Sequence, residues 1–228
     1  MADLAVALDA GNLRQALALV DAIGDAVRWY KIGPVLCLSE GAAVVQELRA
    51  RGKRVFLDLK WHDIPNTVSR AVSVAGELGV SLATVHLAGT TRMLEAAVRA
   101  KSGELRLVGV GVLTSLDAAQ FAEAVGRPVK DVEEEQRRLV RLGVSVGLDG
   151  YVAAAPEIRA VRTVAGGRAL IVVPGIRRAT DAAGDQARTA PPREAAQAGA
   201  DILVIGRPVT AAADPRREAE AIAAEARA

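Results

Sequence analysis

The stretch FLDLKWHDIPNT (residues 56–67) begins like a buried strand and ends in alternating charge. Side chains alternate along a strand, so Asp58 and Lys60 should share one face, while the leucines beside them share the other. Burying charged groups is costly unless they are paired or used. Because the apolar face suits a layer of helices, we expect Asp58 and Lys60 to point toward the interior of a sheet or barrel.

Short apolar runs alternate with helical stretches along the whole chain. Strands that alternate with helices indicate βαβ units around a parallel sheet. Eight such units in a chain of 228 residues predict an α/β fold, a (β/α)8 TIM barrel, with a doubly wound open sheet as the competitor. The eight expected strands are residues 4–8, 27–32, 54–60, 82–87, 105–113, 148–154, 169–174 and 201–206.

No linker, low-complexity segment or change in composition divides the chain, so we expect one catalytic domain over residues 1–228. The longest segment between strands, residues 114–147, should hold two helices. The net charge of +2 gives no reason to expect nucleic acid or a membrane surface as a partner. Cys37 is the single cysteine and is expected to be a packing residue. With no visible signal peptide or membrane-spanning run, we expect a cytoplasmic protein.

The ends of the expected strands carry polar and charged residues, although the strand bodies are apolar. In a TIM barrel the active site lies at these C-terminal ends. Strand alternation also points Asp9 and Lys31 inward, so two carboxylates and two ammonium groups would converge, each offsetting the desolvation of its neighbour. Structural ion pairs are the alternative, but convergence at an open mouth favours a cluster that acts on a substrate. The strand-end residues are Asp9, Lys31, Asp58, Lys60, His86, Thr114, Ser115, Pro174, Arg177, Gly206 and Arg207.

The residues after this charged strand, HDIPNT, raise separate questions. Pro65 should block immediate continuation as a helix, and we expect Asn66 to cap the helix that follows. His62 could be a general base, whereas His86 is expected to be a satisfied histidine of the mouth or core. Neither has a set of cysteines or carboxylates nearby in the sequence, so we expect no zinc site.

A phosphate site is expected after the seventh and eighth strands, where the sequence reads PGIRR and IGRP. Gly206 lets backbone N–H groups approach an anion, and the residues after it should open the last helix, whose N-terminus favours negative charge. Arg207 can bind a phosphate through its guanidinium group. The alternative is that Gly206 is only a turn residue and Arg207 a solvated cap. Residues 177–192 could close over the phosphate, with Gln186 as an amide donor, or form a surface loop.

Taken together, these motifs resemble the orotidine 5′-phosphate decarboxylase family over essentially the whole chain. The D-x-K-x-x-D-I-P-N-T string is highly specific, and its combination with VPGIR and VIGRPVT is stronger still. The motifs are ALDAGN (7–12), WYKIG (29–33), FLDLKWHDIPNT (56–67), GVLTS (111–115), VPGIR (173–177), GDQ (184–186) and VIGRPVT (204–210).

The resemblance implies conversion of orotidine 5′-phosphate to uridine 5′-phosphate and carbon dioxide, the last step of de novo pyrimidine biosynthesis, without metal or organic cofactor. The Lys-Asp-Lys-Asp array of the family maps onto Lys31, Asp58, Lys60 and Asp63. In the family, Asp63 and Thr67 would come from the other subunit of a homodimer with shared active sites.

The resemblance also implies a role for each group. Asp9 and Lys31 would hold ribose hydroxyls, Asp58 would lie beside the substrate carboxylate, and Lys60 would stabilise charge at C6 and deliver the proton there. The implied substrate-binding residues are Asp9, Lys31, Asp58, Ile64, Thr67, Thr114, Ser115, Pro174, Arg177, Gln186, Gly206 and Arg207.

Two other functions remain open at this point. A related sugar-phosphate enzyme, such as 3-keto-gulonate-6-phosphate decarboxylase, shares the D-x-K-x-x-D string but binds magnesium and uses a carboxylate near the position of Lys31. A lysine there would repel the metal ion. A non-catalytic nucleotide-binding barrel is the other alternative, but binding alone does not require Asp58 next to an anionic substrate carboxylate.

Overall fold

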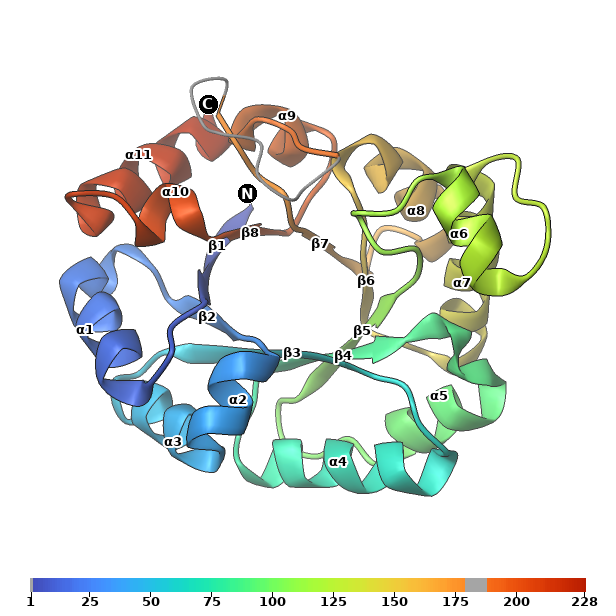
Figure 1. Cartoon of the computed structure of the whole chain (residues 1–228), viewed down its shortest axis with the longest axis horizontal. Coiled ribbons are helices and arrows are strands. Elements are labelled where there is room, and N and C mark those ends of the chain that lie inside the picture. The colour runs from blue at the N-terminus through green and yellow to red at the C-terminus, as the bar shows by residue number, and fades with distance from the viewer. Residues whose placement is uncertain (1, 179–187) are drawn as a thin grey trace.

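The computed structural model describes residues 2–178 and 188–228. Its eight strands form a closed parallel barrel in chain order, with β8 paired to β1 (Figure 1). The predicted TIM barrel is confirmed, and the open-sheet alternative is wrong. The strands are β1 (Asp3–Leu8), β2 (Trp29–Ile32), β3 (Arg54–Trp61), β4 (Leu82–His86), β5 (Arg106–Val110), β6 (Gly150–Val152), β7 (Leu170–Val173) and β8 (Ile202–Ile205).

Helices surround this barrel on the outside (Figure 1). The segment between β5 and β6 holds two of them, as predicted. No helix in the described part of the chain is both long and apolar enough to cross a membrane. The helices are α1 (Leu13–Ile23), α2 (Pro34–Glu40), α3 (Ala42–Ala50), α4 (Pro65–Glu77), α5 (Thr90–Arg99), α6 (Ala118–Val125), α7 (Val132–Val146), α8 (Ile158–Ala165), α9 (Pro192–Gln197), α10 (Arg207–Thr210) and α11 (Pro215–Arg227).

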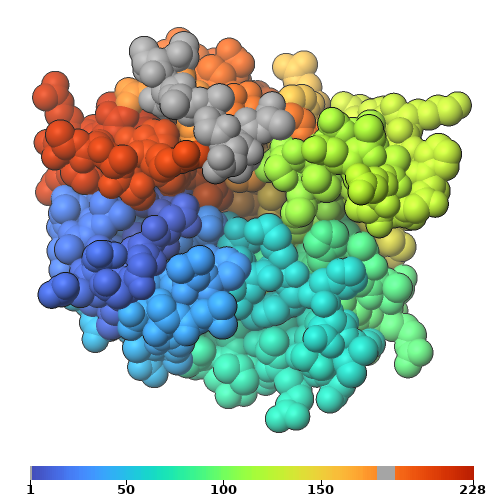
Figure 2. All heavy atoms as spheres, in the orientation of Figure 1, coloured from blue at the N-terminus to red at the C-terminus, as the bar shows by residue number. Residues whose placement is uncertain are grey.

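The strands divide the apolar residues into two cores, because successive side chains point to opposite faces. Val55 and Leu57 belong to the large core between strands and helices. Phe56, together with Trp29 and Ala7, belongs to a smaller cluster inside the barrel. Side chains therefore fill the space that the ribbons leave at the barrel centre, as the all-atom view shows (Figure 2).

Two partly exposed carboxylates make equivalent contacts at the N-terminal end of the barrel. Asp149, just before β6, accepts the N–H of Leu107 on β5 at 2.8 Å and pairs with Lys101 at 2.7 Å. Asp201, just before β8, likewise accepts a β7 N–H at 2.8 Å and pairs with Arg162 at 2.7 Å. Each carboxylate thus ties its own strand to the preceding one at the end opposite the expected active site.

Two local predictions about helix starts are wrong. Helix α4 begins at Pro65, with Ile64 as the flanking residue, so Asn66 lies inside the helix and does not cap it. Proline is favourable at the first helical position because its missing N–H would have no partner there. The residues after Gly206 open the short helix α10, while the last helix, α11, starts at Pro215 and is capped by Asp214.

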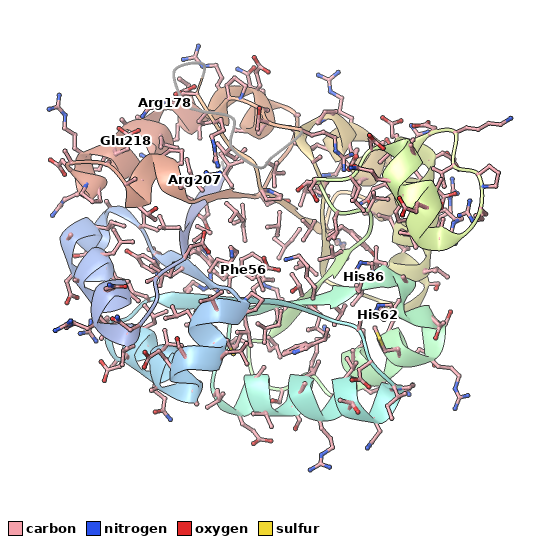
Figure 3. All side chains as sticks on the ribbon, in the orientation of Figure 1. Phe56, His62, His86, Arg178, Arg207 and Glu218 are labelled. Atoms are coloured by element: carbon pink, nitrogen blue, oxygen red, sulfur yellow. The ribbon has the colours of Figure 1, made fainter. Side chains whose placement is uncertain are left out.

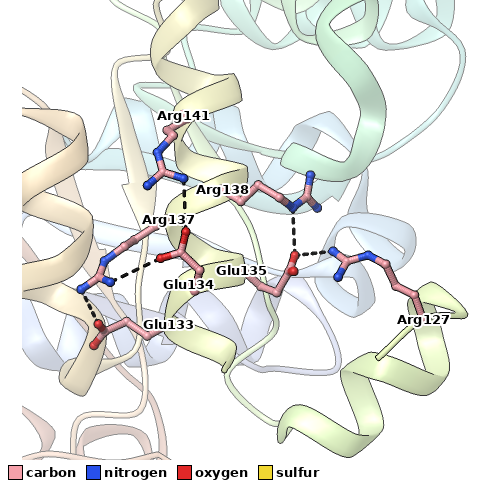
Figure 4. A network of polar contacts seen from close by, with 7 residues as sticks. All are labelled: Arg127, Glu133, Glu134, Glu135, Arg137, Arg138 and Arg141. Carbon is pink, nitrogen blue, oxygen red and sulfur yellow. Dashed lines mark hydrogen bonds and ion pairs between the residues drawn. The ribbon is translucent and has the colours of Figure 1, made fainter. Parts of the chain in front are cut away.

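A network of ion pairs covers the first turns of α7 (Figure 4). Acidic side chains there complement the positive end of the helix and pair with arginines three or four residues later. Arg127, which precedes the helix, reaches Glu135 at 2.6 Å, and Arg138 reaches the same carboxylate at 2.9 Å. Burial alone would raise the pKa of Glu135, but these two hydrogen bonds leave it below its ordinary value. The network therefore ties the loop before α7 to the helix itself.

Candidate active site

A cavity of about 710 Å³ opens at the C-terminal ends of the strands. Its size suits a small organic ligand. It is lined by ten of the residues predicted for the site: Asp9, Lys31, Asp58, Lys60, Thr114, Ser115, Pro174, Arg177, Gly206 and Arg207.

Asp58 lies between two ammonium groups at the floor of this cavity. Nζ of Lys60 is 2.9 Å from Oδ1, and Nζ of Lys31 is 3.7 Å from Oδ2. The side chains of Asp58 and Lys31 are only 15% and 14% exposed, whereas that of Lys60 is 39% exposed. A negative charge is thus held inside the barrel by two positive ones, and Lys60 is the more open to a ligand.

The backbone at Lys60 departs from a regular strand. Lys60 has a φ of 49°, in the left-handed region, and the pairing of β3 with β4 shifts between Leu57 and Trp61. The N–H of Lys60 donates to Oγ1 of Thr84 at 2.8 Å, and this hydroxyl donates to Oδ1 of Asp58 at 3.1 Å. A bulge of this kind re-aims a side chain. Strand alternation placed Lys60 correctly, but it predicted neither the bulge nor Thr84.

Asp63, Ile64 and Thr67 lie outside the cavity of their own chain. All three are exposed, and the Asp63 carboxylate accepts the N–H of Ile64 at 2.6 Å. Within one chain, the structure therefore does not bring these three residues to the groups around Asp58.

The expected phosphate end combines the loops after β7 and β8. Gly175 has a φ of 76°, which favours glycine, and lines the cavity with Arg177, Gly206 and Arg207. The N–H of Arg177 donates to the carbonyl of Ala190 at 3.0 Å, so both ends of the segment after β7 lie together. Gln186 lies outside the described residues.

Arg178, which follows Arg177 in the segment after β7, forms an ion pair with Glu218 of α11 (Figure 3). The chain leaving the expected phosphate end is thereby attached to the last helix.

The sequence of this chain matches a known family. The sequence model of the orotidine 5′-phosphate decarboxylase / HUMPS family matches residues 2–222. The chain belongs to this family. The resemblance stated from the motifs is confirmed.

Close relatives carry one name. Orotidine 5′-phosphate decarboxylase from Methylobacterium radiotolerans is 46% identical, and the match covers 97% of this chain and 95% of the relative. The protein of the same name from Anaeromyxobacter sp. (strain K) is also 46% identical, over 97% of this chain and 96% of its own. The crystal structure of orotidine 5′-phosphate decarboxylase from Lactobacillus acidophilus matches with a TM-score of 0.88, at 30% identity and with full coverage of both chains.

In this member of the orotidine 5′-phosphate decarboxylase family, the two histidines lie together, and neither lines the cavity. The rings of His62 and His86 stack with centroids 5.2 Å apart and planes 15° apart (Figure 3). Nδ1 of His86 accepts the N–H of Ala88 at 3.2 Å. Burial lowers the pKa of His86, and the positive charges of His62 and Lys60 lower it further. Among the described residues, no three His, Cys, Asp and Glu side chains gather in a way that could hold a metal ion.

Gln136 of α7 braces the cavity wall and was not predicted from the sequence. It is fully buried, its Oε1 accepts the N–H of Val112 at 2.9 Å, and its Nε2 donates to the carbonyl of Val152 at 2.9 Å. A methyl group on Gly111 would come within 2.1 Å of this amide oxygen. The glycine of GVLTS therefore makes room for Gln136, which links the end of β5 to the end of β6.

Arg188 joins three of the loops around the cavity and was also not predicted. It forms an ion pair with Glu157, which is 3% exposed. It also donates to the carbonyls of Leu113 at 3.0 Å and Thr114 at 3.4 Å. Burial lowers the pKa of the Arg188 guanidinium. The loop that carries Thr114 is thus attached to the segment that follows β7.

Proposed function

We propose that this protein decarboxylates orotidine 5′-phosphate to uridine 5′-phosphate and carbon dioxide, the last step of de novo pyrimidine biosynthesis. The observation that carries the proposal is the position of Asp58 between Lys31 and Lys60 inside the cavity, in a chain of this family. The names of the relatives support the same reaction.

The chemistry explains why this arrangement is useful. Loss of carbon dioxide from C6 of the pyrimidine leaves a carbanion with little resonance relief, so a fixed positive charge must stabilise it. In the proposed mechanism the substrate carboxylate lies beside Asp58. The ammonium of Lys60 stabilises the developing charge and then gives C6 a proton. The proposed reaction uses no metal or organic cofactor.

The rest of the cavity holds the substrate in place. We assign Asp9 and Lys31 to the ribose hydroxyls, and Thr114 with Ser115 to the pyrimidine. Pro174, Arg177, Gln186, Gly206 and Arg207 belong to the ribose-phosphate end. Phosphate bound far from C6 supplies binding energy that can be used to orient the reacting carbon and exclude water.

A homodimer completes the proposed site. Asp63, Ile64 and Thr67 face away from their own cavity, which is the orientation needed if they enter the cavity of a second copy. Val35 and Leu38 of α2 are 68% and 88% exposed, and Ile64 is 67% exposed. These residues follow the neighbouring strands β2 and β3, so they mark one apolar side of the mouth that a partner subunit can cover.

The test is to incubate the purified protein with orotidine 5′-phosphate in EDTA and follow the pyrimidine absorbance. Turnover in chelator supports the proposal. Turnover that is lost in EDTA and restored by Mg²⁺ would favour the related sugar-phosphate chemistry, and tight binding without turnover would favour a nucleotide-binding barrel. For any lysine variant of the cavity, the exposed Lys130 provides the control, since Lys130→Ala should turn over the substrate like the unchanged protein.

A further inference from the structure

The hydroxyl of Thr84 contacts two members of the charged array at once. Thr84 lies on β4, is 1% exposed and does not line the cavity. Its Oγ1 accepts the backbone N–H of Lys60 at 2.8 Å and lies 3.1 Å from Oδ1 of Asp58. A carboxylate can only accept, so the single hydroxyl proton is directed to Asp58 and the lone pair to Lys60.

The contact to Lys60 matters because the backbone there is unusual. Between the pairs Leu57–Ala83 and Trp61–Val85, four residues of β3 advance against two of β4, so the regular ladder is interrupted. Lys60 adopts a φ of 49° in this bulge. For a residue with a side chain this conformation is unfavourable, and it persists only where the surrounding structure holds it in place. The hydroxyl of Thr84 accepts the N–H of Lys60, in place of the backbone hydrogen bond that regular pairing of β3 with β4 would provide.

The contact to Asp58 fixes the carboxylate. Oδ1 receives the hydroxyl of Thr84 at 3.1 Å and the ammonium of Lys60 at 2.9 Å, while Oδ2 remains on the side of Lys31. Lys60 and Asp58 are therefore joined twice, directly through their side chains and indirectly through Thr84. Because Thr84 is buried, water has little access to replace its hydroxyl.

We propose that Thr84 is a positioning residue that holds the ammonium of Lys60 and the carboxylate of Asp58 in their reactive arrangement. This inference rests on the proposed function, because it assigns Thr84 to the same reaction. Thr84 does not line the cavity and acts through Asp58 and Lys60, which do. The alternative is that Thr84 only packs in the barrel wall, in which case its loss would affect stability but not the chemical step.

The decisive variant is Thr84→Val, which keeps the shape and removes the hydroxyl. We expect kcat for orotidine 5′-phosphate to fall by roughly 10- to 100-fold, because small misplacements of a reacting group have effects of this size. The dissociation constant for uridine 5′-phosphate should stay nearly unchanged, since the phosphate and ribose contacts remain. Thr84→Ser, which retains the hydroxyl, should recover most of kcat.

The matched control is Thr163→Val on α8, which removes an exposed hydroxyl that donates to the carbonyl of Arg159 at 2.8 Å. This variant should keep the unchanged kcat. If Thr84→Val fails to fold, Thr84→Cys serves in its place. The cysteine side chain is nearly as large as that of threonine, and its thiol is only a weak hydrogen-bond donor. A full kcat in a folded Thr84→Val or Thr84→Cys protein would overturn the proposal.

A crystal structure of the same variant separates this inference from the proposed function. If the unchanged protein does not turn over orotidine 5′-phosphate, the proposed function fails, but the geometry can still be tested. The inference predicts that Lys60 leaves the left-handed region, or that its Nζ moves away from Asp58, when the hydroxyl is absent. An unchanged bulge with an unchanged Lys60–Asp58 contact would overturn it.

Discussion

Nζ of Lys60 lies 2.9 Å from Oδ1 of Asp58 in the absence of any ligand. In the proposed mechanism, a substrate carboxylate that approaches Asp58 meets a negative charge whose nearest ammonium is the group that protonates the carbanion. The same ammonium then has two proposed roles, to neutralise Asp58 in the free protein and to stabilise the carbanion during the reaction.

Lys60→Ala should reduce kcat by roughly 10²- to 10⁴-fold, the range expected when a general acid is removed. Calorimetric binding of uridine 5′-phosphate should be largely retained, because the expected phosphate contacts lie elsewhere in the cavity. Lys130→Ala serves as the matched lysine control. If Lys60→Ala keeps its turnover, Lys60 is not the acid.

Mixing Lys60→Ala with Asp63→Ala should restore part of the activity that each protein has lost alone. In a mixed dimer with shared sites, one cavity would contain both unchanged residues. Turnover is measured before and after mixing, and subunit exchange is verified by mass spectrometry. An absence of recovery after proven exchange would contradict the proposal that Asp63 acts in trans.

His86→Gln should make the stability of the protein less sensitive to acid. Burial lowers the pKa of His86 in the folded chain, with His62 and Lys60 adding to the effect, whereas a histidine in an unfolded chain has a pKa of about 6.5. As the pH falls through about 6.5, the unfolded state takes up a proton that the folded state does not, so stability decreases. Above about pH 6.5, His86 makes no contribution to the pH dependence of stability.

The measurement is the free energy of unfolding in urea, between about pH 7.5 and about pH 5.5. The unchanged protein should lose more stability over this interval than His86→Gln does. Equal losses in the two proteins would show that His86 is not the source of the acid sensitivity.

Removing one partner of the Arg188–Glu157 pair should destabilise the protein and raise KM. Glu157 is 3% exposed, and leaving one charge of a buried pair without its partner costs about 3–5 kcal/mol. KM should rise because the loop with Thr114 loses its attachment. A double-mutant cycle of Glu157→Gln and Arg188→Met should show a coupling energy of about 0.5–3 kcal/mol. The exposed Arg193 gives the control, Arg193→Met, and additive effects of the two variants would contradict the coupling.

The parts of the site that could be predicted depend on the period of two along a strand. That period placed Asp9, Lys31 and Asp58 inside the barrel, because neighbouring apolar residues must face the helices. It could not reveal the bulge at Lys60, which depends on a partner on β4, 24 residues further along.

Contacts between distant segments were missed for the same reason. Gln136 reaches two strand ends, and Arg188 reaches a carbonyl 75 residues away. The stacking of His62 on His86 also joins the segment after β3 to the end of β4. The prediction that Asn66 caps α4 was wrong for a local reason, since Pro65 is itself suited to the first helical position.

The carboxylates of Asp149 and Asp201 have a practical consequence for redesign. They fasten adjacent strands at the end of the barrel away from the cavity, through backbone N–H groups that do not depend on the mouth loops. The loops at the mouth can then be exchanged or lengthened while this fastening stays intact. The barrel is for that reason a suitable scaffold for evolving decarboxylases that accept other carboxylic acids.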